Sequence, residues 1–147
     1  MAASVRILDK GLAALLKRVG VKSGLTVGIH EEQGAAAHGP ATIAEIGAMH
    51  EFGLGNPPRS FIGAWADERE GDHTADLKKL AEAVHKGKVA PAQGLEQLGE
   101  KYVGEVQGRI AGGIAPANAP ATIAKKGSST PLIDTGVLRS SITKRVA

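Results

Sequence analysis

The sequence predicts an α+β fold, in which several amphipathic helices pack on a small, mainly antiparallel sheet and leave an extended loop and an arm outside it. Several stretches carry apolar residues at steps of three and four, as amphipathic helices do. Residues 25–30 instead alternate apolar and polar residues, as half-buried strands do, and residues 141–146 also have strand character. Aromatic residues are only 3% of the chain, so we expect an aliphatic core and no ligand pocket walled by aromatic rings. One domain, residues 1–147, fits this length.

The first predicted helix covers residues 5–19, where the apolar residues form a single stripe that ends before a glycine. After the first strand, residues 31–39 are small and polar, which indicates a loop. Thr42 and Glu45 then match a Thr-x-x-Glu capping box. We therefore expect a second helix that begins there and stops near Gly53.

Residues 53–59 combine two glycines, an asparagine and a Pro-Pro pair, which is incompatible with regular structure and indicates a shaped loop. Ser60 follows this loop and is placed to cap a helix that carries Phe61 and Trp65 on one face. Thr74 is expected to cap another helix in the same way.

Pro91 is expected to open a longer helix with an apolar side that reaches Ile110. Gly104, Gly108 and Gly112 lie four apart in this helix, so they line one strip. Such a strip lets another helix or subunit approach closely. The alternative interpretation is a marginal helix that frays in isolation, because each interior glycine costs up to about 1 kcal/mol relative to alanine.

Residues 111–131 are rich in Gly, Ala, Pro and Ser, which indicates an extended arm. Asp134 is expected to cap a short helical turn before the second strand, and that strand is expected to pair with residues 25–30. The string Pro-Ala-Thr-Ile-Ala occurs at 40–44 and again at 120–124. We interpret it as one Pro-started, Thr-capped helical turn used twice.

Composition and charge exclude several classes of protein. The chain has no cysteine, which excludes disulfides, iron–sulfur clusters and thiolate zinc sites. No stretch approaches the roughly 20 apolar residues that span a bilayer and no secretion signal is evident, so we expect a soluble chain. Residues 101–147 hold 7 basic and 2 acidic groups, against 11 and 13 in residues 1–100. This basic last third fits a nucleic-acid contact, an acidic protein partner or a solvated tail.

Three strings resemble catalytic motifs, and each is incomplete. Asp-Thr-Gly at 134–136 resembles an aspartic-protease loop, but no second copy exists and too few residues follow to enclose a site. His-Glu at 50–51 begins a zinc-protease motif whose second histidine position is Leu54. Ser141-x-x-Lys144 lacks the companion motifs of serine acyl-enzymes. We therefore expect no enzyme activity and no cofactor, and we expect no catalytic, cofactor-binding or metal-ligating residue. The weakest alternative is a hydrolase that uses Asp134.

Two blocks of the chain resemble the phage virion-morphogenesis and tail-component proteins. Residues 44–53, Ala-Glu-Ile-Gly-Ala-Met-His-Glu-Phe-Gly, and Pro-Pro-Arg-Ser-Phe-Ile at 57–62 are similar to the "IA-x-x-HEFG … IPARPF" block of that family. Residues 120–127 and 131–142 are similar to its "SPATIARKG … PLIDTGxLRxSI" ending. The departures from the usual family pattern are residues 56–58 and 118–119.

This resemblance implies an α+β subunit of a structural virion protein, which assembles as a ring, expected to be hexameric, at the head–tail junction. Tail-terminator, tail-completion and neck positions are all compatible with it. The implied partners are copies of the chain itself and the tail-tube and head-connector proteins, with packaged DNA nearby and no membrane. The implied location is the virion, after assembly in the cytoplasm of the host bacterium. The alternative function is nucleic-acid binding through the basic C-terminal third, which steeply salt-dependent DNA binding would favour.

Ring subunits present two different patches to their neighbours, and the loop 53–59 and the arm 111–131 suit that purpose. Arg59 and Arg139 are expected to make charge-assisted bonds to a neighbour or to a carboxylate within the fold, because arginine presents a planar fork of donors. The expected contact residues are Phe52, Pro57, Pro58, Arg59, Phe61, Asp134, Leu138 and Arg139.

Overall fold

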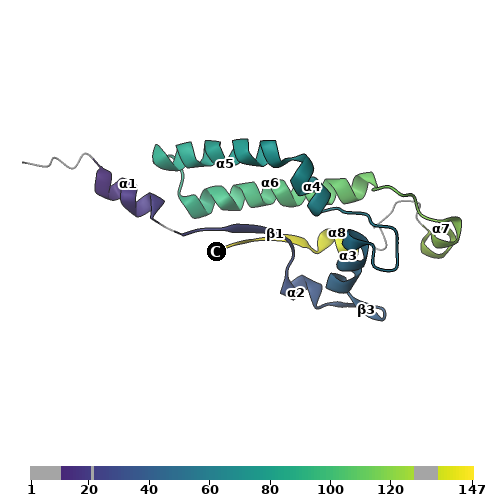
Figure 1. Ribbon diagram of the computed structural model, residues 1–147. Coiled ribbons are helices and arrows are strands. Elements are labelled where there is room, and N and C mark those ends of the chain that lie inside the picture. Colours follow the sequence, from purple (N-terminus) through teal and green to yellow (C-terminus); the bar gives the residue numbers. More distant parts are fainter. Residues whose placement is uncertain (1–10, 21, 128–135) are drawn as a thin grey trace, which may run out of the picture.

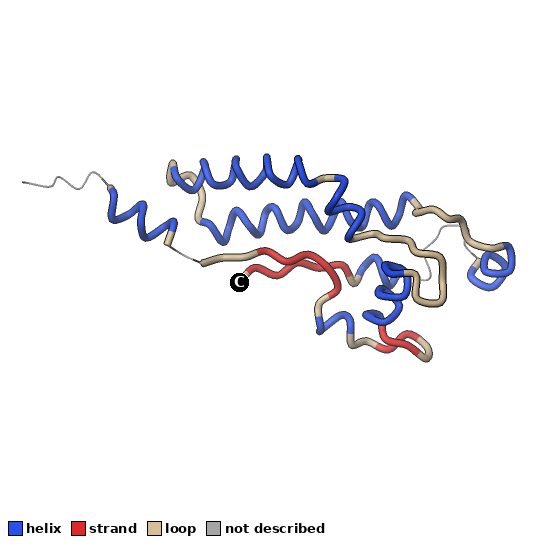
Figure 2. The backbone as a smooth tube through the Cα atoms, in the orientation of Figure 1, coloured by secondary structure: helices blue, strands red, loops and turns tan. Residues whose placement is uncertain are grey.

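The computed structural model describes residues 11–20, 22–127 and 136–147. In chain order the elements are α1 (Leu12–Val19), β1 (Leu25–Ile29), α2 (Glu31–Gly34), β2 (Ala37–His38), β3 (Ala41–Thr42), α3 (Ile43–Phe52), α4 (Gly63–Glu68), α5 (Glu70–His85), α6 (Pro91–Gly112), α7 (Pro120–Lys126), α8 (Val137–Ser140) and β4 (Ile142–Val146). The molecule is elongated, with α5 and α6 on one side of the β1–β4 pair and α2 and α3 on the other (Figures 1 and 2). The predicted α+β class with small antiparallel sheets is confirmed.

The main sheet joins two segments that are far apart in the sequence. Strands β1 and β4 are antiparallel, with Leu25 opposite Val146 and Ile29 opposite Ile142. The apolar residues of β1, Leu25, Val27 and Ile29, pack against the core cluster, and Ile142 of β4 belongs to it. The predicted pairing of these two stretches is confirmed.

Helix α6 lies along this sheet and supplies much of the core. It begins with Pro91, as predicted, since proline is tolerated in the first turn, where its missing N–H is not needed. Among the described residues no helix, α6 included, combines the length and the apolar character that crossing a bilayer requires. The core cluster consists of Ile43, Phe61, Trp65, Tyr102, Val106, Ile110, Leu138 and Ile142.

A cluster of three rings attaches α4 and α5 to α6. The His73 ring contacts Trp65 and Tyr102, with centroid separations of 4.6 and 4.7 Å, and Trp65 and Tyr102 meet edge to face at 5.5 Å. The Trp65 indole N–H also donates to the Glu105 carboxylate at 3.0 Å. Aromatic pairs add about 0.5–1.5 kcal/mol beyond the area that they bury. The expectation of an aliphatic core is therefore wrong at this end of α6.

Two predicted local structures differ from the observed ones. Residues 31–39, expected to be a loop, contain α2 and the first strand of the β2–β3 hairpin. Glu31 and Glu32 occupy the first turn of α2, where negative charge favours a helix N-terminus. Thr74 caps no helix, because α5 already begins at Glu70 and passes through it.

The predicted arm is helical over part of its length. Residues 120–126 form α7, which ends at Gly127 in the left-handed conformation. The repeated string also adopts two different structures. In the first copy Thr42 caps α3 through the predicted box, whereas in the second copy Pro120 begins the helix and Thr122 lies inside it. The interpretation of one turn used twice is therefore wrong.

The glycines of α6 divide into two groups. A Cβ atom at Gly94 would collide with Leu80, and one at Gly99 would lie 2.5 Å from Lys144 Cδ and 2.9 Å from Leu25 Cδ1. Gly104, Gly108 and Gly112 are exposed and would meet nothing within 4 Å. Close packing inside the chain thus uses the N-terminal glycines of α6, not the predicted strip.

Replacement of these glycines tests that division. We expect Gly99→Ala to lower the free energy of unfolding by about 1 kcal/mol or more, because the added methyl overpacks the helix–sheet contact. Gly104→Ala, the matched control on the open face, should raise it by up to about 1 kcal/mol through helix propensity. Urea denaturation of both variants measures these changes. Stabilisation by Gly99→Ala would show that the contact is loose.

Candidate functional site

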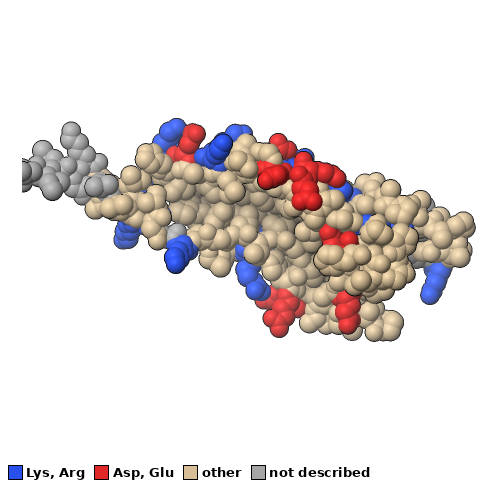
Figure 3. Space-filling model, viewed as in Figure 1, with Lys and Arg blue, Asp and Glu red and all other residues tan. Residues whose placement is uncertain are grey.

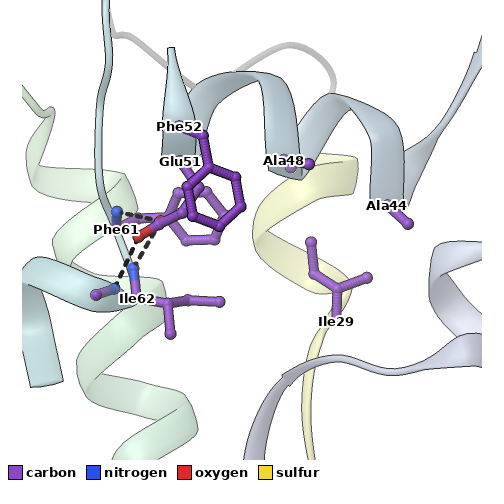
Figure 4. A pocket seen from close by; sticks show the side chains of 9 residues that line it. Ile29, Ala44, Ala48, Glu51, Phe52, Phe61 and Ile62 are labelled. Atoms are coloured by element: carbon purple, nitrogen blue, oxygen red, sulfur yellow. Dashed lines mark hydrogen bonds between the residues drawn. The ribbon is translucent and has the colours of Figure 1, made fainter. Parts of the chain in front are cut away.

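One carboxylate organises the turn that follows the shaped loop. Glu51, near the end of α3, accepts the Ser60 hydroxyl at 2.6 Å and the Gly63 N–H at 2.8 Å through Oε1. Its Oε2 accepts the N–H groups of Phe61 at 2.9 Å and Ile62 at 3.1 Å (Figure 4). We call residues 60–63 with this carboxylate the Glu51 turn. It supplies the acceptors that the N–H groups before α4 need.

The hydrogen-bond donors of the turn stabilise the ionised form of the Glu51 carboxyl. Burial raises the pKa of its carboxyl, while the bonds from Ser60 and from the backbone N–H groups lower it, and the net pKa lies below its ordinary value of 4.5. Ser60 also accepts the Ala64 N–H at 2.8 Å, so it bonds to the first turn of α4, but the predicted cap position is wrong, because α4 begins at Gly63 and its N-cap is Ile62. The turn is therefore held by an ionised acceptor at neutral pH.

Arg59 connects the shaped loop to the arm. Its side chain is buried, and it donates from Nε to the Pro116 carbonyl at 2.8 Å and from an Nη to the Ala117 carbonyl at 3.3 Å. Its own N–H donates to the His50 carbonyl at 2.7 Å. The predicted charge-assisted bond to a neighbour or to a carboxylate is wrong for Arg59, since its partners are carbonyls of its own arm. The loop and the arm therefore form one surface.

An apolar groove lies beside the Glu51 turn. It has a volume of about 400 Å³ and is lined on one wall by Ala44, Ala48 and Phe52 of α3, with Ile29 and Ile62 opposite (Figure 4). We call it the α3 groove. The Phe52 side chain at its rim is 72% exposed, and Leu54 beyond it is 56% exposed. Exposed apolar residues next to a groove are typical of a protein–protein contact.

Comparison of the chain with protein families, curated proteins and solved structures finds no match. Its function is therefore inferred from its own residues and their geometry.

Apart from Arg59, whose side chain is buried against the arm, the predicted contact residues fall into three groups. Phe52, Pro57 and Pro58 are exposed around the loop, as a contact surface requires, and Arg139 is exposed on α8. Phe61 and Leu138 belong to the core, so their assignment to a contact surface is wrong, since a core side chain cannot face a partner. Asp134, including its predicted capping role, lies outside the described residues.

The strings that resemble catalytic motifs have structural roles where they are described. All four donors to Glu51 come from the turn that it caps. Ser141 is buried and donates to the Val137 carbonyl at 2.8 Å, while Lys144 is paired with Glu96 and Glu100. Within residues 11–20, 22–127 and 136–147, no group of three or more metal-ligating side chains is close enough to hold an ion.

Sequence reasoning did not identify Glu51 as the organising residue. The available signal was a carboxylate at the end of a predicted helix, nine residues before a serine that begins the next helix. Gly63 belongs to the same arrangement, since a Cβ atom there would lie 2.9 Å from Glu51 Oε1, but this contact is visible only in the structure. The sequence alone does not show that the loop between Glu51 and Ser60 folds back.

Replacement of the carboxylate tests the Glu51 turn. We expect Glu51→Gln to lower the free energy of unfolding by about 1–3 kcal/mol at neutral pH, because an amide offers the N–H groups fewer and weaker acceptors. Since the folded pKa lies below 4.5, the stabilisation is present above that pH and is lost as pH falls through the folded value. Urea denaturation from about pH 7 to about pH 3 measures both effects.

The matched control is Glu82→Gln, which removes a carboxylate from an exposed pair with Lys86 on α5. It should change stability by less than about 0.5 kcal/mol. An equal loss in the two variants, or a Glu51→Gln difference that does not shrink in acid, would refute the assigned role.

Proposed function

We propose that this chain is a structural virion protein of a tailed phage, and that its copies form a ring at the head–tail junction or at the head-proximal end of the tail. Its proposed partners are further copies of itself and the adjoining tail-tube and head-connector proteins. A tail-terminator, tail-completion or neck position would each use such a ring. We propose no catalytic role.

The observation that supports this proposal is the union of the two sequence blocks in one core. Phe61 from the first block packs in the same cluster as Leu138 and Ile142 from the second. Gly47 allows this approach, since a Cβ atom there would lie 2.7 Å from Ile29 Cδ1 and 3.6 Å from Leu138 Cδ1. The described residues 57–62 and 137–142 of the two blocks thus contribute to one core.

The outer side of this unit supports an interaction role. Phe52, Leu54, Pro57 and Pro58 are all exposed within a stretch of seven residues, and Phe52 lines the α3 groove. The Glu51 carboxylate behind them is occupied by its four donors, so it is committed to structure. The exposed residues are apolar, and the polar groups of the Glu51 turn behind them are already hydrogen-bonded to one another. This arrangement suits a docking surface better than a reaction centre.

The charges give less support to nucleic-acid binding. Several basic side chains of the C-terminal third lie in ion pairs, which neutralise them within the chain. These pairs are Lys101 with Asp76, Arg109 with Glu68, Lys144 with Glu96 and Glu100, and Arg145 with Glu32. Lys and Arg side chains are interspersed with acidic ones on the face shown in Figure 3.

Deletion of the gene from the phage that carries it tests the proposal. We expect particles with unjoined heads and tails, or with tails of abnormal length, because the ring between the two parts is missing. Electron microscopy of the lysate detects these forms, and a plasmid copy of the native gene should restore normal particles. Normal infectious particles without the gene product would contradict the proposal. Steeply salt-dependent DNA binding by a monomeric chain would favour the alternative instead.

A further inference from the structure

Helix α1 presents an apolar surface that the described residues, 11–20, 22–127 and 136–147, do not cover. Leu16 and Val19 are 58% and 56% exposed although both belong to the apolar stripe of the helix. The helix contacts the end of α5, where Arg18 donates to the His85 carbonyl at 3.4 Å. An amphipathic helix with part of its apolar stripe in water gains stability when a partner covers that stripe.

The α3 groove is the corresponding concave surface, and it lies far from α1. Figure 1 places α1 at one end of the elongated molecule and α3 towards the other. Ala44 and Ala48 keep the α3 wall of the groove low, and Phe52 closes one rim. Small residues on one helix let a second helix approach closely. Because of the separation, the α1 that enters a groove has to come from another copy.

The charges of the two surfaces are complementary. Residues 11–24 contain three basic residues, Lys17, Arg18 and Lys22, and no acidic residue. Residues 31–52 contain no Lys or Arg, and they contain four glutamates. Glu51 is held by its turn and Glu32 pairs with Arg145, while Glu31 and Glu45 are exposed. Figure 3 shows blue side chains projecting near α1 and red ones over α2 and α3. This opposition favours α1 against the groove and disfavours contact between two copies of either surface.

We propose that α1 of one copy docks in the α3 groove of the next copy, with Leu16 and Val19 against Phe52, Ala44 and Ala48. Each chain then uses two different patches at its two ends, which is a head-to-tail contact that repeats and closes as a ring. This inference rests on the proposed function and deepens it, because it names the surfaces through which the ring forms.

Charged substitutions on either surface test the docking. Leu16→Asp and Phe52→Asp should each weaken self-association of the purified full chain by on the order of 30-fold, the loss typical of an interface hot spot. Leu77→Asp is the matched control, since Leu77 is also an exposed leucine, 51% exposed, but lies on α5. Analytical ultracentrifugation measures association, and circular dichroism establishes that each variant melts like the native chain.

A mixture of the two variants distinguishes this contact from a symmetric one. The Leu16→Asp chain keeps its groove and the Phe52→Asp chain keeps its α1, so the mixture should form dimers that grow no further. Failure of the mixture to associate, a monomeric native chain, or native-like assembly of either variant would overturn the docking.

Cross-linking locates the contact directly, because the native chain has no cysteine. A Leu16→Cys, Ala44→Cys chain should form disulfides between copies under mild oxidation, while a Leu77→Cys, Ala44→Cys chain should not. Equal cross-linking in both would overturn the proposal. A ring that persists in both Asp variants would refute the docking and leave the proposed function intact. If the purified chain docks in this way but is absent from virions, the proposed function is refuted and the docking is not.

Discussion

The fold around the candidate surface depends on the ionised carboxylate of Glu51. Its four hydrogen bonds fix the backbone at residues 60–63, and this geometry directs Phe61 into the core. The same turn positions the preceding Arg59, which holds the carbonyls of Pro116 and Ala117. Hydrogen bonds to an ionised carboxylate are stronger than hydrogen bonds between neutral groups. They also replace the hydrogen bonds to water that these backbone N–H groups would otherwise need. Glu51 therefore links α3 to α4, and Arg59 beside the same turn links it to the arm.

The outward surface follows from this inward arrangement. Phe52 comes directly after Glu51 on α3, so fixing the carboxylate towards the turn leaves the phenyl ring at the rim of the α3 groove. The Arg59 contact places the arm beside the loop, although the two are more than fifty residues apart. A docking surface built from rigidly held segments loses little conformational entropy when a partner binds. The exposed face of α1 provides a second surface at the opposite end.

The sequence was informative where a pattern acts locally. Alternation in β1, the Thr42–Glu45 box and Pro91 each act through neighbouring residues, and each prediction was confirmed. Residues 120–124 repeat residues 40–44 but fold differently, because the surrounding chain decides which residue begins the helix. At the site, the sequence predicted which segments contribute, but not which of their side chains are exposed and which are buried. Phe52 and Phe61 lie in the same block, yet only the Glu51 turn determines that one is exposed and the other buried.

The central claim is that a single carboxylate couples the loop and the arm. Hydrogen–deuterium exchange on the native chain and on Glu51→Gln tests this coupling most directly, because it reports the opening of each segment separately. The account predicts faster exchange in the variant at residues 53–63 and also at residues 113–119, with the β1–β4 ladder unchanged. Faster exchange confined to residues 60–63, with the arm as protected as in the native chain, would contradict it.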